Sequence, residues 1–403
     1  MSGKNANSSL PRGFSFAATR CGIRKSRADL GVIVAEKAVS AAAVFTTNLV
    51  KAAPVLVSRE HLAASKRRVR AVVVNSGNAN CATGAAGLAA SRATAAALAR
   101  ELGCSPEEIQ VCSTGVIGLP LAVEKITGAL PDLVASRTES AESFAEFAGA
   151  IMTTDTRPKQ ACASCRIGGK TVRVAGCAKG AGMIHPQMAT MLAFIVTDAA
   201  ANPAVLRRSL REVVDRTFNA ITVDGDTSTN DTVLLLASGA SGAPSLVPDS
   251  DDEKRFVQAL EKVCRALALE IVADAEGAEH VVEIEVRGAP NNGAARRVAE
   301  TIATSPLVKT ALAGADPNWG RVLAAAGRSG VNFDPAKSRV WLAGQLVCRG
   351  GTPVPFDEAD VHRLMEQREF AVAIDLGAGL GRARMWTCDF TAEYVRINAS
   401  YRT

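Results

Sequence analysis

A glycine-containing segment near the middle of the chain is where the sequence offers a nucleophile. Residues 177–192, CAKGAGMIHPQMATML, join a strand-like run at 171–174 to an apolar run at 191–196. Two glycines and a proline interrupt the segment, so its backbone is free to form a strained turn. Spacing alone is most typical of a surface loop between two strands. The sharper hypothesis is a loop that presents the hydroxyl of Thr190 in front of a buried strand.

Signatures of other common catalytic sites are missing from the sequence. The chain has only four histidines and no G-x-S-x-G elbow, so a Ser-His-Asp hydrolase is not indicated. No G-x-x-x-x-G-K-[ST] loop is present, because in the run 179–182 the lysine precedes the glycines. The ten cysteines are scattered, and the lone C-x-x-C at 162–165 has no second pair at zinc-site spacing. We therefore expect no metal.

The composition is that of an ordinary globular protein. The 403 residues are 48% hydrophobic with a formal net charge of +6, which excludes intrinsic disorder. The basic run at 66–70 has no interleaved aromatic residues, so we expect no nucleic-acid binding. No apolar stretch is long enough for a membrane helix, and the polar N-terminus leads into no signal-peptide core. The sequence predicts a cytoplasmic protein.

Helical and strand patterns that must position the nucleophile alternate along the chain. Residues 87–102 are alanine-rich and stop at Gly103, as a helix does at its C-terminal glycine. Ser105-Pro106 with two following glutamates is typical of a helix start. Alternation of apolar and charged residues at 282–287 predicts a half-buried strand. A helix over about 252–273 is predicted from apolar residues at steps of three and four: Phe256, Leu260, Val263, Leu267 and Ile271. A mixed α/β or α+β protein fits these patterns.

The segment 179–192, KGAGMIHPQMATML, resembles the K-G-S-G-M-I-H-P-N-M-A-T-M-L motif of the ornithine acetyltransferase (glutamate N-acetyltransferase) family of arginine biosynthesis. It departs from that motif only at Ala181 and Gln187. The resemblance covers nearly the whole chain through further motifs in one order: FTTN (45–48), AAP (52–54), NSGNAN (75–80), STGVIG (113–118), MTTDT (152–156), DGDTSTND (224–231), DPNWGR (316–321) and YVRIN (394–398).

This resemblance implies a self-cleaving enzyme. The cut falls between Ala189 and Thr190 and yields an α chain, 1–189, and a β chain, 190–403. Thr190 then becomes an N-terminal nucleophile, whose own α-amino group, with a reference pKa of about 7.7–8.0, can take the hydroxyl proton near neutral pH. Before cleavage the hydroxyl must attack the carbonyl that precedes it, and the small Ala189 leaves room for that attack.

The resemblance also implies the residues of the site. The Thr114 hydroxyl and the Gly115 N–H would form the oxyanion hole that acyl transfer needs. Lys179 offers a cation for a carboxylate, and Glu276 offers an anion for an ammonium group. For one substrate contact Thr153 is implied, and its neighbour Thr154 stays an alternative. The substrate contacts carried over are Thr153, Lys179, Thr190, Glu276, Asn398 and Thr403.

The activity implied by the resemblance is a two-step, ping-pong acetyl transfer. Thr190 takes the acetyl group of N-acetylornithine, and glutamate then accepts it to give N-acetylglutamate. No cofactor is expected, although bifunctional members of the family also use acetyl-CoA as a co-substrate. The implied fold is a sandwich of stacked β-sheets flanked by helices, with a smaller C-terminal domain within roughly residues 280–370. The implied assembly is an α₂β₂ heterotetramer with small-molecule substrates as its other partners.

Three alternatives stay open from the sequence. An N-terminal-nucleophile aminopeptidase or amidase would use the same nucleophile, with water as the acceptor. An uncleaved scaffold without activity is the second. A specialised-metabolism acetyltransferase of the same family is the third, because Glu279-His280 replaces the usual Thr-Lys after Glu276. That change predicts a titratable ring in place of a cation beside the substrate carboxylate.

Overall fold

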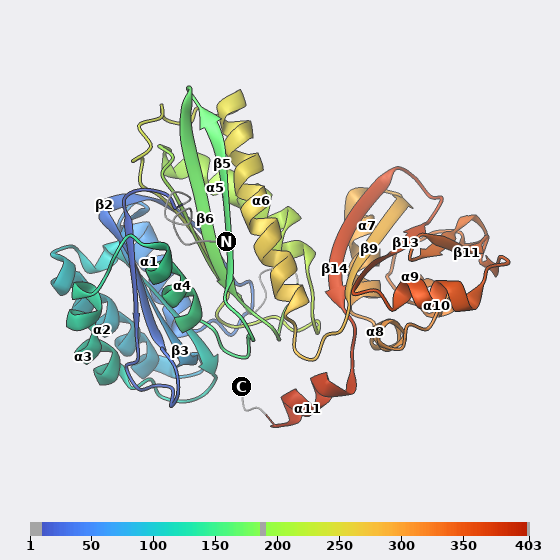
Figure 1. Cartoon of the computed structure of the whole chain (residues 1–403), viewed down its shortest axis with the longest axis horizontal. Helices are drawn as coiled ribbons and strands as arrows, with labels where there is room; N and C mark the ends of the chain where they lie inside the picture. The colour runs from blue at the N-terminus through green and yellow to red at the C-terminus, as the bar shows by residue number, and fades with distance from the viewer. Residues whose placement is uncertain (1–9, 186–190, 401–403) are drawn as a thin grey trace.

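The computed structural model describes residues 10–185 and 191–400 (Figure 1). Within them the strands form two sheets. The eight-stranded sheet has the order β4-β3-β2-β8-β7-β6-β5, with β1 paired to β2, and the six-stranded sheet has the order β12-β11-β10-β13-β9-β14. The strands are β1 Phe14–Thr19, β2 Leu30–Phe45, β3 Arg68–Asn78, β4 Ile109–Val116, β5 Lys159–Ile167, β6 Lys170–Lys179, β7 Leu192–Thr197, β8 Thr232–Ala237, β9 Val281–Ala289, β10 Arg339–Leu342, β11 Gln345–Arg349, β12 Thr352–Pro353, β13 Glu369–Asp375 and β14 Gly381–Cys388.

Helices begin and end where local sequence signals place them. Helix α2 ends at Leu102, and Gly103 follows with a left-handed φ of 61°, as predicted. Helix α6 carries its predicted apolar stripe on the buried face, and the Ser250 side chain caps it by accepting the N–H of Glu253. The α-helices are α1 Ala53–Ala64, α2 Gly84–Leu102, α3 Val123–Ala135, α4 Ala141–Ala150, α5 Pro203–Arg216, α6 Asp251–Ala273, α7 Asn292–Ala303, α8 Pro306–Ala313, α9 Trp319–Gly327, α10 Glu358–Met365 and α11 Ala392–Ser400.

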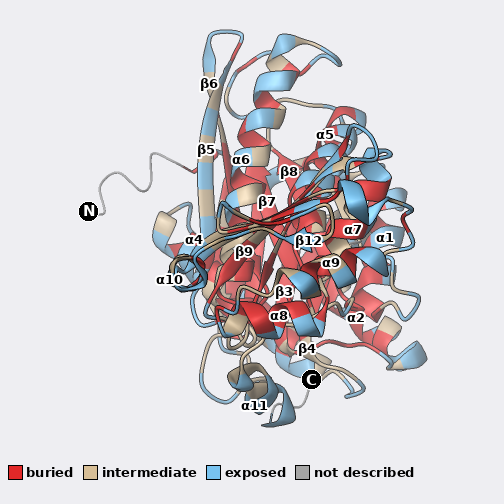
Figure 2. Cartoon of the chain, turned by 90° about the vertical axis from the view of Figure 1, so that its right-hand side faces the viewer, coloured by how far each residue is buried: buried red, intermediate tan, exposed pale blue. Residues whose placement is uncertain are grey.

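The long strand β2 folds the first sheet into two stacked halves. Its start pairs with β3 and its end pairs with β8, and the register shifts between Val34 and Val39. Phe16 and Ile33 of one half therefore pack against Phe194 of the other in a single buried cluster. Helices α2 and α3 cover the outer face of the β3–β4 half, and α5 and α6 cover that of the β7–β8 half. Figure 2 shows the buried residues concentrated in these central strands. Stacked sheets flanked by helices confirm the expected fold class.

The aromatic residues between the stacked halves carry a large share of the packing. Phe147 of α4 is fully buried, and its ring meets that of Phe194 edge-on with 5.5 Å between centroids. Phe147→Ala leaves a ring-sized cavity, so the free energy of unfolding should fall by about 3–5 kcal/mol in urea titrations. Leu380→Ala is the control: Leu380 is 91% exposed, so its loss should change the free energy by less than about 0.5 kcal/mol. Equal effects of the two variants would contradict this packing.

The C-terminal unit has its own sheet and its own core. Strands β9 to β14 enclose a separate apolar cluster, to which helix α7 contributes Val298 and Ile302. Strand β14 belongs to this sheet because it pairs antiparallel with β9, so the sheet runs from Val281 to Cys388 and extends beyond residue 370. The chain then turns back toward the larger unit, where α11 is the last described element (Figure 1).

One local prediction differs from the structure, and one run with turn-forming residues is extended for the same reason. The helix start at Ser105 yields only a single 3-10 turn, Pro106–Glu108, before β4 begins. The run 75–78, which is rich in turn-forming residues, is the end of strand β3. In both places the parallel pairing of β3 with β4 supplies backbone hydrogen bonds that override the local preference. This pairing determines where Thr114 and Gly115 lie.

Candidate active site

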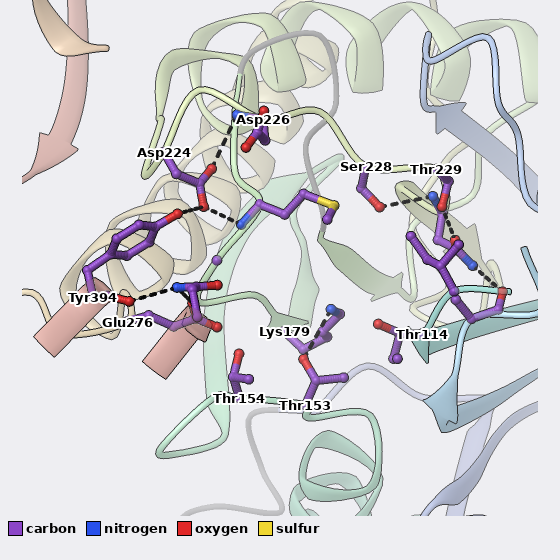
Figure 3. Close-up of a pocket in the computed structure, with 17 residues that line it drawn as sticks. Thr114, Thr153, Thr154, Lys179, Asp224, Asp226, Ser228, Thr229, Glu276 and Tyr394 are labelled. Carbon is purple, nitrogen blue, oxygen red and sulfur yellow. Dashed lines mark hydrogen bonds between the residues drawn. The ribbon is translucent and has the colours of Figure 1, made fainter. Parts of the chain in front are cut away.

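Six of the residues expected at the site line one cavity of about 230 Å³ (Figure 3). They come from β4, from the segment after α4, from the end of β6, from the loop after α6 and from α11. In chain order they are Thr114, Gly115, Thr153, Lys179, Glu276 and Asn398. Since these residues span nearly 300 positions of the sequence, only the tertiary fold brings them together.

Three expected site residues, Ala189, Thr190 and Thr403, lie outside the described residues. Ala189 and Thr190 belong to the internal segment 186–190. Before this segment, Asp224 accepts the backbone N–H groups of Met183 at 2.6 Å and Ile184 at 2.9 Å. On the other side, the N–H of the buried Met191 donates to Asp231 at 2.9 Å. The loop 224–231 therefore anchors both described ends of the predicted cleavage segment.

Gly115 lies where no other residue fits without movement. Its φ is +130°, and a Cβ built on it would lie 2.4 Å from the carbonyl carbon of Gly77 on the neighbouring strand. The strand end is held by side chains, because the Ser113 hydroxyl donates to Asn75 at 2.6 Å and Asn230 donates to the Ser113 carbonyl at 2.8 Å. The buried Thr114 next to it also lines the cavity. The geometry suits a fixed pair of hydrogen-bond donors.

Lys179 brings a buried ammonium group to the cavity. Its Nζ lies 3.5 Å from the Thr153 hydroxyl. Burial lowers the pKa of Lys179, while the Asp155 and Asp231 carboxylates act in the opposite direction. Thr154 lines the cavity as Thr153 does, but the described contact with Lys179 is made by Thr153. A carboxylate that enters the cavity would meet the Lys179 ammonium, which is buried and therefore contacts little water.

Helix α11 closes another side of the cavity without burying any residue of its own. Asn398 donates to the Glu276 carboxylate at 2.8 Å, and the Tyr394 hydroxyl donates to Asp224 at 3.3 Å. The Tyr394 ring stacks on Phe390 with centroids 4.7 Å apart. These contacts aim the Glu276 carboxylate toward the same space as Lys179 (Figure 3).

Several lining residues were missed from the sequence. Tyr394 belongs to the run 394–398 and the others belong to the run 224–231. The sequence identifies both runs only as family motifs. Burial raises the pKa of Asp224 among them. The missed polar residues are Asp224, Asp226, Ser228, Thr229, Asn230 and Tyr394. Dense clusters of Asp, Ser, Thr and Asn in those runs were the signal that could have identified them.

His280 corrects the expectation of a titratable ring beside the substrate carboxylate. Its Nδ1 lies 3.1 Å from Asp389, and that carboxylate also accepts the backbone N–H groups of Glu279 and His280. The ring packs edge-on to Phe370 and does not line the cavity. The histidine therefore helps to attach the C-terminal segment, because Asp389 directly follows β14.

The described residues form neither a candidate metal site nor a membrane-spanning helix. Across residues 10–185 and 191–400, no three His, Cys, Asp or Glu side chains are grouped to hold a metal ion. Over the same ranges, no helix has the length and apolar character needed to cross a bilayer.

Comparison with known proteins identifies the family. The ArgJ family model matches residues 15–403. The chain belongs to the ArgJ family. It is 47% identical to the arginine biosynthesis bifunctional protein ArgJ of Symbiobacterium thermophilum over 396 residues, which is 98% of both chains. The ArgJ protein of Chlorobaculum tepidum is also 47% identical, over 98% of this chain and 96% of its own length.

A solved ArgJ structure is similar as well. The crystal structure of the arginine biosynthesis bifunctional protein argJ from Bacillus halodurans is 40% identical and has a TM-score of 0.50. The match covers 52% of this chain and 98% of that chain. Membership of the ArgJ family confirms the expectation of an acetyltransferase of arginine biosynthesis.

Proposed function

We propose that this ArgJ-family chain cleaves itself before Thr190 and then transfers an acetyl group from N-acetylornithine to glutamate. The observation that carries the proposal is the convergence on one cavity of an oxyanion-hole pair, Thr114 and Gly115, with a cation, Lys179, and an anion, Glu276. Acyl transfer between amino acids needs all of these groups, because charge develops on the acyl oxygen while both substrates carry charged ends.

In maturation, the Thr190 hydroxyl is the nucleophile that cleaves the peptide bond before it. The Oγ attacks the Ala189 carbonyl, the amide bond between these residues breaks, and the acyl group moves to Oγ as an ester. Water then hydrolyses the ester, which leaves a carboxylate on residue 189 and a free α-amino group on Thr190. That amine can deprotonate the adjacent hydroxyl, so the chain needs no histidine for this task.

Transfer then takes two half-reactions. Thr190 Oγ attacks the acetyl carbonyl of N-acetylornithine, and the developing oxyanion receives hydrogen bonds from Thr114 and Gly115. The intermediate collapses, the departing amine takes a proton, and ornithine leaves an acetyl-threonine ester behind. The α-amine of glutamate attacks this ester, which gives N-acetylglutamate and restores the hydroxyl. None of these steps requires a cofactor, and acetyl-CoA would enter as an alternative acetyl donor if the chain is bifunctional, as its relatives are named.

The length of a solved relative supports the cleavage step. The Bacillus halodurans chain is matched over 98% of its own length by 52% of this chain. It is therefore about half as long as the 403-residue chain, as a fragment ending or starting at the 189–190 bond would be. The α₂β₂ assembly and the cytoplasmic location stay predictions.

Intact mass spectrometry of the purified protein tests the proposal, together with an acyl-partition assay. We expect two fragments, 1–189 and 190–403, and a new N-terminus that begins Thr-Met-Leu-Ala. With N-acetylornithine and glutamate, acetylglutamate should be the main product. Free acetate as the main product in the presence of glutamate would instead indicate the amidase alternative, and an uncleaved, inactive chain would indicate a scaffold.

The Glu276 carboxylate is expected to contribute to substrate affinity. Glu276→Gln keeps the shape and the contact with Asn398 but removes the charge. The KM for N-acetylornithine should rise about tenfold or more in initial-rate assays, because a hydrogen bond to a charged group is lost. Glu279→Gln provides a matched control, since Glu279 is exposed and does not line the cavity. Equal KM values for the two variants would remove Glu276 from the site.

A further inference from the structure

Beside the cavity, a second buried lysine holds two carboxylates. Lys159, the first residue of β5, places its Nζ 2.6 Å from Asp155 and 2.6 Å from Asp274. The three side chains are 0%, 0% and 2% exposed, in the order Lys159, Asp155, Asp274. Since buried charges are stable only when they are paired and hydrogen-bonded, this group forms one closed unit.

Both oxygens of the Asp155 carboxylate accept hydrogen bonds from residues at or beside the cavity. Its Oδ1 accepts the N–H of Gly180 at 2.7 Å in addition to Lys159, and its Oδ2 accepts the N–H of Thr153 at 2.9 Å. Burial works to raise the pKa of Asp155, but Lys159, Lys179 and the Gly180 N–H outweigh burial and hold that pKa below its ordinary value. Asp155 is therefore an anion at neutral pH.

The ammonium group of Lys179, the lysine that lines the cavity, has no close carboxylate contact among the described residues. Among the described residues, the Thr153 hydroxyl at 3.5 Å is the hydrogen-bond partner of the Lys179 ammonium. The Asp155 carboxylate attracts this ammonium most strongly, ahead of Asp231 and Glu276. Two buried lysines thus compete for Asp155, and it is Lys159 that makes the close contact, at 2.6 Å.

We propose that Lys159 is a positioning residue that occupies Asp155 and so leaves the Lys179 ammonium available for the carboxylate of the substrate. Without Lys159, the buried Asp155 anion would draw Lys179 to itself, because an uncompensated buried charge is costly. The inference rests on the proposed function, since it assumes that Lys179 binds a substrate carboxylate.

The test compares Lys159→Met with two double variants by initial-rate kinetics with N-acetylornithine and glutamate. Lys159→Met should raise the KM for both substrates about tenfold or more, the effect of losing one charge-assisted hydrogen bond. The kcat should stay within about threefold, because the oxyanion hole and the nucleophile are untouched. Lys159→Gln is the second variant, for use if Lys159→Met does not fold, because glutamine is less apolar than methionine. The same changes in KM and kcat are expected for it.

Rescue distinguishes competition from a merely structural role. Adding Asp155→Asn to Lys159→Met removes the rival anion, so the KM should return to within about threefold of that of Asp155→Asn alone. Adding Asp274→Asn removes the same amount of charge but leaves Asp155, the carboxylate that contacts Thr153 and Gly180 beside Lys179, so the KM should stay high. Equal KM values in the two double variants would overturn the proposal, and so would Lys159 variants that fail to cleave. Absence of transfer by the wild-type chain would instead reject the proposed function.

Discussion

Thr190→Ala is expected to leave a single full-length chain and to abolish acetyl transfer. Without the hydroxyl neither the Ala189 carbonyl nor the acetyl group can be attacked, so the rate should fall by about 10⁴-fold or more. Thr190→Ser keeps a hydroxyl and should still cleave, at a changed rate. Denaturing gels and intact mass spectrometry report the cleavage, and acetylglutamate formation reports the transfer.

The control for this experiment is a buried threonine of β7. Thr197, the last residue of β7, is buried, and its hydroxyl donates to the Arg173 carbonyl at 2.7 Å. The same hydroxyl accepts the Ala199 N–H at 3.2 Å, so Thr197→Ala removes two hydrogen bonds at the end of β7. It should lower stability by about 1–2 kcal/mol and still permit cleavage. If Thr190→Ala produced the same two fragments as the wild type, the nucleophile would lie elsewhere.

The second large effect is expected from Gly115→Ala. The new Cβ would lie 2.4 Å from the Gly77 carbonyl carbon, and φ at this position is +130°. The end of β4 must therefore move, and its N–H can no longer point where the oxyanion forms. We expect kcat to fall by about 10²–10³-fold, as for the loss of one oxyanion-hole donor.

Gly118→Ala separates this effect from backbone strain. Gly118 has a φ of +83° with no atom within 4 Å of a built Cβ, and it does not line the cavity. Its substitution should cost about 1 kcal/mol of stability through strain alone and leave kcat unchanged. Thermal melts of both variants measure the loss of stability, and steady-state rates measure the loss of kcat. A Gly115→Ala enzyme with normal kcat would exclude this N–H from the oxyanion hole.

Local sequence patterns predicted the elements whose cause is local. The end of α2 at Gly103 follows from the ease with which glycine adopts a left-handed φ. The buried stripe of α6 follows from apolar residues at helical spacing. The helix expected at Ser105 was wrong because its cause is not local: the pairing of β4 with β3 decides that region.

The sequence by itself determined the family, the mixed α/β class and six residues that the fold brings to one cavity. Tertiary structure alone decided that Tyr394 binds Asp224, that His280 faces Asp389 and that Lys159 joins Asp155 to Asp274. Each of these contacts joins segments far apart in the chain, apart from the Lys159–Asp155 pair. Motifs record which residue types are present, whereas burial decides which carboxylate each cation must neutralise, and burial exists only once the chain is folded.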